Sequence, residues 1–436
     1  MTALLTFLGI LVFVIGMVVS VSLHEAGHMI PAKKFGMKVT QFFFGFGRTV
    51  WSFKRGETEY GIKAIPFGGF VRIIGMLPPG KDQDPDKVRS ASTGPFQSLV
   101  DNARAAEYET IDPADHGRLF YQKPWWQKLI VMASGPLVNV VIAFILFGGL
   151  FMIYGASELQ TTVKTVSECV IPANEATPTR KCTDKDKVSP AQAAGIKPGD
   201  RIVSFNGVQI TEWEQLTPLI RANTDKAATI VVERDGKQLP PLQTNTMLNQ
   251  VIEKTGSDKV VNVGFLGVSP ETEIVRQGPV YTIKQMGVIT EATFQALLRF
   301  PQKLVGVAEA IVGGERDKNG PMSVVGAGRV AGEVASDQSI TGGARFAFLI
   351  SLLASVNLFL ALFNFVPLLP LDGGHMVGAI WEGIKRGFAK LLGRPDPGHV
   401  DVGKLLPVAY VMASIFVVMG VLLVIADVVN PIRLNG

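Results

Sequence analysis

The stretch "VSLHEAGHMIPAKKFG", Val21 to Gly36, places an H-E-x-x-H motif at the end of an uncharged apolar run that begins at Ala3. A run of this length crosses the hydrocarbon core of a bilayer, about 30 Å thick, as one helix. Histidines four residues apart project from one helix face, a spacing that suits one metal ion. The sequence therefore predicts a metal site at the end of a membrane span. A cleaved signal peptide is less favoured, because no basic n-region precedes the run and no A-x-A site follows it.

The composition is that of a membrane protein with a substantial polar part. Hydrophobic residues make up 47% of the chain and charged residues 18%, and the mean hydropathy is +0.29. Three further apolar runs follow the first: Leu129 to Tyr154, Phe346 to Leu371 and Leu405 to Val429. We therefore expect about four transmembrane helices. Nucleic-acid binding has no support, because no dense basic tract lies beside aromatic residues.

The placement of basic residues predicts the topology. Lysines flank the first two spans, and basic residues fill the loop between the last two; they are Lys33, Lys34, Lys38, Lys123, Lys128, Lys385, Arg386, Lys390, Arg394 and Lys404. The positive-inside rule then places both of these loops in the cytoplasm. The long connection from about Gly155 to Arg345, and both termini, are expected outside. Cys169 and Cys182 fall in this outer segment, where a disulfide persists, and we favour a pair over two free thiols.

The first cytoplasmic loop begins with four short strand patterns: "VTQFFFGFG", "TVWSFK", "TEYGIKAI" and "FGGFVRIIGM". Lys54 to Glu57 is suited to a hairpin turn between the second and third. Because aromatic and apolar residues are abundant here, we expect a small β-unit that dips towards the bilayer, where its backbone needs internal pairing. The stretch "LPPGKDQDPDKVRSASTGP" that follows is polar and rich in Pro and Gly, which predicts a linker.

The outer segment has an α/β pattern. The stretch "AGIKPGDRIVSFNG" resembles a PDZ domain of the bacterial protease type. An amphipathic helix follows it, with Trp213, Leu216, Leu219 and Ile220 on one face. From Thr282 to Arg345 the pattern becomes helical, and we expect this part to lie against the membrane surface.

A catalytic zinc site needs three protein ligands and one open position. His24 and His28 supply two, and Glu25 beside them is placed to accept a proton from water that the metal activates. The third span ends in "NFVPLLPLDGGH", where Asp372 and His375 compete as the third ligand. An acid at the end of a membrane span is costly and is therefore a candidate functional residue.

Three motifs in this order, "HEAGH", "GPLVN" and "NFVPLLPLDGG", with the PDZ-like segment between the last two, resemble the site-2 protease family of intramembrane zinc metalloproteases. The chain is most similar to actinobacterial members. The resemblance implies one zinc ion per chain, with ligands His24, His28 and Asp372 and with Glu25 as the base. It also implies that Asn364 and Pro367 handle substrate beside the zinc and that His375 is not a ligand. Leu369 departs from the family, which often has Pro there, so the local loop shape can differ.

A helical substrate hides its carbonyl groups in i to i−4 hydrogen bonds and must unwind before it is cleaved. The strand "PFGGFVRI", with Gly68, Gly69, Phe70 and Val71, is our candidate for holding the unwound segment by β-addition. A purely structural hairpin that packs on the first span is the alternative. In the second span, Gly135, Pro136 and Asn139 favour close helix packing, with Asn139 orienting a site residue.

The predicted fold is an α-helical polytopic membrane protein with a membrane re-entrant β-hairpin unit and an extracytoplasmic PDZ-like α/β domain. Its predicted parts are spans at 1–32, 125–154, 346–375 and 405–429, a cytoplasmic loop at 33–124 with the β-unit at about 39–76, a PDZ-like domain at 160–270, a membrane-associated helical segment at 271–345 and a second cytoplasmic loop at 376–404.

The predicted function is intramembrane zinc endopeptidase in a bacterial plasma membrane, acting in regulated intramembrane proteolysis. By resemblance, the substrates are single-span proteins such as anti-sigma factors and remnant signal peptides, after an upstream cut. One alternative is a membrane-anchored PDZ scaffold with a vestigial metal site. A membrane-bound zinc peptidase that acts on soluble chains is another.

Overall fold

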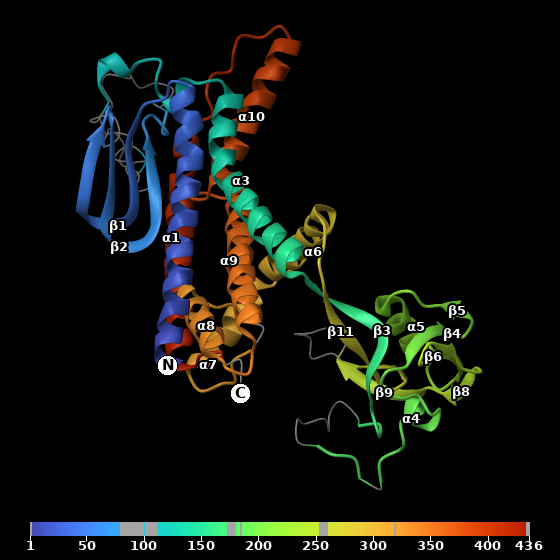
Figure 1. The fold of residues 1–436 in the computed structure, drawn as a ribbon. Helices are drawn as coiled ribbons and strands as arrows, with labels where there is room; N and C mark the ends of the chain where they lie inside the picture. Colours follow the sequence, from blue (N-terminus) through green and yellow to red (C-terminus); the bar gives the residue numbers. More distant parts are fainter. Residues whose placement is uncertain are drawn as a thin grey trace. The chain divides into compact units, whose positions relative to one another are not determined.

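The computed structural model describes residues 2–78, 100, 111–171, 180–183, 185–252, 260–317 and 320–432. The chain forms two compact units, drawn together in Figure 1. Unit 1 consists of Met1–Leu150 and Gly278–Gly436, and unit 2 of Phe151–Gln277. The linker predicted at residues 77–95 lies almost wholly outside the described residues.

Unit 1 is mainly helical. Its helices are α1 (Thr2–Lys34), α3 (Trp125–Gly149), α6 (Pro279–Leu298), α7 (Phe300–Ile311), α8 (Val324–Ser336), α9 (Gly342–Asn364), α10 (Asp372–Leu391) and α11 (Leu406–Val429). Short 3-10 turns lie at Pro113–Asp115, Phe120–Gln122 and Val402–Leu405, and a π-helical turn, Leu150–Tyr154, follows α3. Among the described residues, four segments are long and apolar enough to cross a membrane, which agrees with the predicted number: Thr2–Lys34, Trp125–Tyr154, Gly342–Asn364 and Val402–Val429.

Helix α1 is the central element of the bundle and lies beside α3, α8 and α9 (Figure 1). Its apolar run supports one long helix, which ends where Pro31 enters the last turn and Gly36 adopts a left-handed φ of 70°. Near its start, a side chain at Gly9 would collide with the α8 backbone at Ala331. Near its end, a side chain at Gly27 would collide with the carbonyl oxygen of Ser134 in α3. Close packing therefore holds α1 at both ends.

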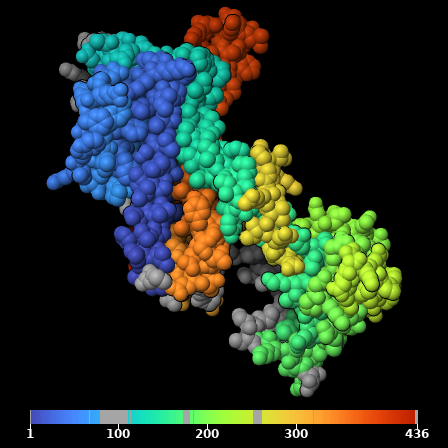
Figure 2. Space-filling model, in the orientation of Figure 1, coloured from blue at the N-terminus to red at the C-terminus, as the bar shows by residue number. Residues whose placement is uncertain are grey.

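The β-unit consists of two long bent strands, β1 (Val39–Arg55) and β2 (Thr58–Ile73), rather than the four separate strands expected. Because both strands bend, four strand segments lie in one sheet. Their order across the sheet is 69–73, 39–44, 59–62 and 51–55, and each segment pairs with the next. Gly45 allows the bend in β1, because its φ is 86° and a side chain there would collide with the carbonyl oxygen of Ile65. Figure 2 shows this sheet, in blue, against α1.

Two predicted boundaries are wrong. The third span was expected to run to residue 375, but α9 ends at Asn364, and Asp372 begins α10 after a turn that contains Pro367 and Pro370. Helix α10 also occupies half of the predicted second cytoplasmic loop. The basic residues in this stretch, among them Lys385, Arg386 and Lys390, led the sequence analysis to assign it as a cytoplasmic loop. Its amphipathic helical pattern was therefore overlooked. The helical segment expected from residue 271 begins instead at Pro279, because the strand β11 runs from Val268 to Val275.

Unit 2 is an α/β unit whose larger sheet is antiparallel and has strands of different lengths. Its strands are β3 (Ala156–Val166), β4 (Arg201–Phe205), β5 (Val208–Gln209), β6 (Ala227–Arg234), β7 (Lys237–Gln238), β8 (Leu242–Asn245), β9 (Met247–Ile252), β10 (Val260–Phe265) and β11 (Val268–Val275). The order in the larger sheet is β11-β3-β4-β6-β7, with β5 on β4 and β8 on β6, while β9 and β10 pair separately. The short helix α4 (Pro190–Ala193) and α5 (Trp213–Ala222) complete it, and the α5 side chains Trp213, Leu216 and Ile220 are buried in its core. A disulfide joins Cys169 and Cys182.

A buried carboxylate organises the Pro-Gly-Asp turn of unit 2. The fully buried Asp200 accepts hydrogen bonds from Arg234 Nε at 2.6 Å, from Arg234 Nη2 at 2.8 Å and from the Lys197 amide at 2.8 Å. Burial by itself raises the pKa of Asp200, but the hydrogen bonds and charge of Arg234, with the Lys197 amide, outweigh burial and lower this pKa below its ordinary value. The carboxylate therefore stabilises the turn in its ionised form.

We predict that Asp200→Asn destabilises unit 2 by about 1.5–3 kcal/mol, because it weakens hydrogen bonds to a charged group. Hydrogen exchange of the β4 and β6 amides in the full chain at pH 7 measures the loss. Since the pKa of Asp200 is lowered on folding, its contribution is present above the unfolded pKa of about 3.9 and is lost as the pH falls through the folded pKa. The difference between the two proteins should therefore shrink in acid. Equal exchange at pH 7 would show that the prediction is wrong.

Candidate metal centre and active site

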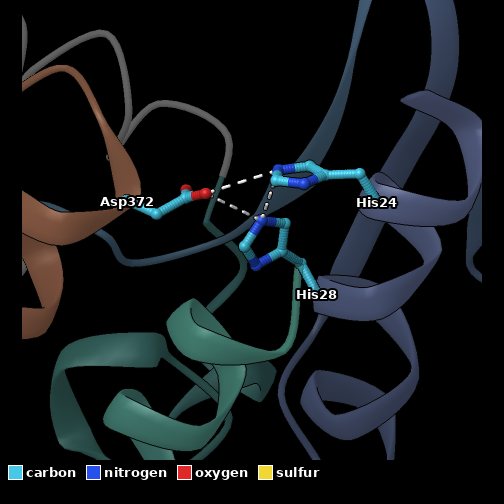
Figure 3. Close-up of side chains that lie close together, drawn as sticks. All are labelled: His24, His28 and Asp372. Atoms are coloured by element: carbon cyan, nitrogen blue, oxygen red, sulfur yellow. Dashed lines mark hydrogen bonds and ion pairs between the residues drawn. The ribbon is translucent and has the colours of Figure 1, made fainter. Parts of the chain in front are cut away.

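Three side chains from two helices converge on one point in unit 1 (Figure 3). His24 and His28 project from one face of α1, and their Nε2 atoms are 3.2 Å apart. Asp372, the first residue of α10, brings its Oδ2 atom to 3.3 Å from each of these nitrogens. Both histidines are buried and the carboxylate is half-buried. Among the described residues, this is the one cluster of three such groups that can hold a metal ion.

The local sequence around Asp372 explains how the carboxylate reaches this point. Between the end of α9 and the start of α10 the chain makes a tight turn. Cβ atoms at the two positions that follow Asp372 would collide with the backbone of this turn. A Cβ on Gly373 would lie 2.2 Å from the carbonyl oxygen of Val366, and one on Gly374 would lie 2.7 Å from the amide nitrogen of Leu369. The Gly-Gly pair is therefore what allows α10 to begin directly at the ligand position.

The three ligand atoms have the spacing of a zinc site. Zinc takes imidazole nitrogen at about 2.0–2.1 Å and carboxylate oxygen at about 2.0–2.2 Å, so tetrahedral ligand atoms lie about 3.3 Å from one another. The observed edges are 3.2, 3.3 and 3.3 Å. The Oδ2 atom of Asp372 is buried and makes no hydrogen bond, as expected of a metal ligand. Two imidazoles and one carboxylate also leave one position open, as catalytic zinc sites do.

Helix α3 holds the outer nitrogens of both imidazoles. The carbonyl oxygen of Val131 lies 2.7 Å from His28 Nδ1, which places the proton on Nδ1 and leaves Nε2 free to bind metal. This contact requires close approach, because a Cβ on Gly135 would lie 2.1 Å from His28 Nε2. The packing role expected of Gly135 therefore includes direct contact with a metal-site imidazole, which sequence reasoning missed.

Asn139, also on α3, faces the other imidazole. Its Nδ2 atom lies 3.2 Å from His24 Nδ1, and its Oδ1 atom is buried without a hydrogen-bond partner. An imidazole that binds metal through Nε2 carries its proton on Nδ1 and needs an acceptor there. A half-turn of the amide brings Oδ1 to His24 Nδ1 and satisfies both groups. Asn139 is therefore suited to hold His24 in its metal-binding tautomer.

The cluster opens into a cavity of about 410 Å³. The cavity wall gathers most of the site residues expected from the sequence, namely His24, Glu25, His28, Gly68, Gly69, Phe70, Val71, Asn139, Asn364, Asp372 and His375. Pro367, Gly135 and Pro136 are not in it, and Cys169 and Cys182 belong to unit 2. His375 lines the cavity but is outside the three-residue cluster. The apolar wall residues Val21, Ile73, Met76, Met132 and Leu360 carried no sequence signal, because ordinary core residues look the same.

One wall of the cavity is the backbone of β2. Segment 69–73 pairs with β1 on one side, and no other described strand pairs with its second side. A Cβ on Gly69 would lie 3.1 Å from Cγ of Glu25 and 3.3 Å from Val21, so the missing side chain allows the strand to approach α1 at Glu25. An edge strand therefore runs beside Glu25 and the metal cluster.

We predict that Asn139→Leu weakens zinc binding about 10- to 100-fold, because the acceptor for the His24 Nδ1 proton is lost while the side-chain volume is kept. Competition with a chelator of known zinc affinity measures the change. The matched control is Asn139→Asp, which keeps an acceptor oxygen and should retain most of the affinity. If the two variants bind zinc equally, Asn139 does not act through the His24 proton.

The sequence is similar to those of known zinc metalloproteases. The model of Peptidase family M50 matches residues 12–392. The chain is 33% identical to the zinc metalloprotease Rip1 of Mycobacterium tuberculosis, over 98% of each chain, and 33% identical to Rip1 of Mycolicibacterium smegmatis, also over 98% of each. It is 27% identical to the metalloprotease MmpA of Caulobacter vibrioides, over 88% of this chain and 89% of the relative.

These matches extend over nearly the whole chain and include both candidate metal-binding motifs and the helices that carry them. Zinc is therefore the cofactor, and the four apolar helices make the chain an integral membrane protein. The chain belongs to peptidase family M50, the site-2 protease family, and is an intramembrane zinc metalloprotease.

Proposed function

We propose that this protease cleaves single-span membrane proteins within the bilayer, with His24, His28 and Asp372 as zinc ligands and Glu25 as general base. The observation that carries the proposal is the triangle of ligand atoms with edges of 3.2–3.3 Å at the wall of a cavity that Glu25 also lines. When bound, zinc supplies Lewis-acid polarisation and makes water nucleophilic near neutral pH. Glu25 takes the proton from that water and returns it to the leaving amine.

The placement of basic residues supports a site near the cytoplasmic face. His28 is followed within two turns by Lys33 and Lys34 at the end of α1, and such clusters favour the cytoplasmic side. Water then reaches the cavity from the cytoplasm, while both chain termini and unit 2 lie outside in a bacterial plasma membrane. This topology also puts the Cys169–Cys182 disulfide in a compartment that preserves it.

We predict that Glu25→Gln retains zinc but reduces proteolysis by at least about 10²–10⁴-fold, because the amide cannot accept a proton. The measurements are the zinc content of the purified variant and cleavage of a single-span model substrate in liposomes. The cut site, mapped by mass spectrometry, should lie inside the transmembrane segment. A cut in a soluble region would instead support a peptidase of soluble chains. Wild-type turnover by the fully zinc-loaded variant would remove Glu25 from its role.

We further propose that the unwound substrate pairs with the side of segment 69–73 of β2 that no other described strand occupies. An extended peptide added at segment 69–73 gains main-chain hydrogen bonds beside Glu25, without demands on its side chains. Gly68, Gly69, Phe70 and Val71 line the same cavity as the three clustered residues, so a peptide added here lies beside the candidate ligands. Exposed apolar side chains on this sheet, among them Phe46, Val50 and Trp51, support its insertion into the bilayer as a re-entrant unit.

We predict that Arg72→Pro sharply reduces cleavage of a membrane substrate while zinc content stays intact, because proline lacks the N–H group and disrupts a strand. Arg72→Ala is the matched control, since it loses the same side chain but keeps the backbone donor, and it should cleave near the wild-type rate. Equal activity of the two variants at equal expression would contradict substrate pairing at this strand.

The substrates we propose are anti-sigma factors and remnant signal peptides that an upstream protease has already trimmed. Unit 2 acts as a PDZ-like domain that excludes bulky uncut proteins or binds a newly exposed end. The order of its turn, strand and helix around Asp200 supports this assignment. A membrane-anchored scaffold with a vestigial metal site is not favoured, because all three candidate ligands, Glu25 and a cavity are retained together.

A further inference from the structure

A buried ion pair joins two of the helices that build the metal site. Lys128, in the first turn of α3, places its Nζ atom 2.6 Å from Oε2 of Glu382, in the middle of α10. The side chains of Lys128 and Glu382 are 6% and 2% exposed. Charges removed from water in this way are costly unless they are paired closely, and loss of one partner leaves the other uncompensated. The pair therefore strongly favours one arrangement of α3 and α10.

Further polar contacts surround both members of the ion pair. Lys128 Nζ also donates to the carbonyl oxygen of Tyr121 at 3.3 Å, and the amide of Val400 donates to Glu382 Oε2 at 3.3 Å. The remaining neighbours are Arg386 Nη2 at 3.4 Å and His399 Nδ1 at 4.0 Å from Oε1. Burial and then the charge of Lys128 lower the pKa of His399, which disfavours its charged form. Lys128 is the closest cation to Glu382 among the described residues.

The position of the pair along each helix connects it to zinc. Glu382 follows Asp372 by ten residues on α10, which is about 15 Å of helix. Lys128 precedes Asn139 by eleven residues on α3, about 16 Å. At the zinc end, α10 supplies Asp372, while α3 holds the outer nitrogens of His24 and His28. The pair thus ties the helix of the third ligand to the helix that orients the first two.

A close backbone approach beside the pair shows that the two helices meet tightly here. A Cβ on Gly383 would lie 2.7 Å from the ring of Trp125. Helix α10 therefore rests on the first turn of α3 at two adjacent points, one polar and one apolar. With its first residue at the zinc cluster and its middle fixed to α3, α10 has little freedom to pivot.

We propose that Lys128 and Glu382 are positioning residues for zinc: their buried ion pair sets the placement of α10 and so of Asp372 in the metal cluster. The inference rests on the proposed ligand set. It makes a remote pair, about 15 Å of helix from the ligand, part of the machinery that holds the metal. Neither residue belongs to the three-residue cluster or lines the cavity.

The test is the zinc affinity of purified full-length protein, measured by chelator competition, for Glu382→Gln and Lys128→Met. Each should bind zinc about tenfold more weakly than wild type, the lower end of the range for residues that orient metal ligands. Because the pair acts as a unit, the double variant should lose less affinity than the sum of the two single losses. Additive losses, or wild-type affinity in folded single variants, would overturn the proposal.

A matched control separates positioning from general stability. Asp427, on α11, forms a comparably buried pair with Arg316, with Oδ1 to Nη2 at 3.0 Å and side-chain exposures of 3% and 4%. Helix α11 carries no proposed ligand, so Asp427→Asn should lower the unfolding temperature without changing zinc affinity of the folded protein. Cobalt substitution adds a spectroscopic readout, because visible Co²⁺ band intensities report ligand geometry. The bands should change in Glu382→Gln and stay unchanged in Asp427→Asn; equal changes in both would also overturn the proposal.

A further variant distinguishes failure of the inference from failure of the ligand set. Asp372→Asn should weaken zinc binding far more than His375→Ala, because it removes an anionic ligand. If Asp372→Asn has no effect, the proposed ligands are wrong and the positioning role falls with them. If Asp372→Asn weakens zinc binding but Glu382→Gln does not, only the role of the ion pair is wrong.

Discussion

The structure of unit 1 depends on bringing one carboxylate to two imidazoles inside a helical bundle. His24 and His28 need only the geometry of α1, since four residues make one turn. Asp372 arrives from a helix 344 residues later in the chain, and its oxygen must come within 3.3 Å of both nitrogens. In the proposed site, a displaced α10 would carry this oxygen out of the zinc–carboxylate bonding distance of about 2.0–2.2 Å. The close contacts of α1, α3 and α10 therefore serve the same requirement, and the glycines at 27, 135, 373 and 374 permit them.

The β-unit meets a second requirement, because a protease needs its substrate extended and the bilayer favours a helix. Backbone groups without partners are costly in hydrocarbon, which excludes open sheet edges facing lipid. Here no other described strand pairs with the second side of segment 69–73, which lies at the cavity beside Glu25, while segment 51–55 forms the other edge of the sheet. In our proposal the unwound substrate supplies the missing partner. When the substrate pairs with the strand, it supplies hydrogen-bond partners for the strand's backbone groups and places the scissile bond beside Glu25, the proposed base. Binding and unwinding of the substrate are therefore coupled.

The sequence predicted the parts of the site whose physics is local, and it missed the parts that depend on distant contacts. The H-E-x-x-H spacing identified His24 and His28, and the family resemblance favoured Asp372 over His375 as the third residue of the cluster. Uninterrupted apolar runs indicated the four spans. The Lys128–Glu382 pair joins residues 254 positions apart, for which one sequence carries no signal. For Asn139 the sequence suggested that it orients a site residue, but not that this residue is His24, 115 positions away. Lys128 was read as a topology marker at a membrane flank. Its burial beside α10 became visible only when the helices were packed.

Each helix that lines the cavity carries a buried polar group that contacts a neighbouring helix, and the need to place zinc ligands precisely accounts for these contacts. An apolar interface in lipid tolerates sliding, since lipid tails and Leu side chains are equally apolar, whereas a buried polar pair has one favourable geometry. Ser20 and Asn357 join α1 to α9 by a 3.0 Å hydrogen bond one turn from His24, and Lys128 and Glu382 join α3 to α10. Each helix that lines the cavity thus has a polar tie to a neighbour. Burying these polar groups costs desolvation free energy, but it fixes the relative positions of the helices. A metal site whose ligands come from helices far apart in the sequence needs such fixed positions.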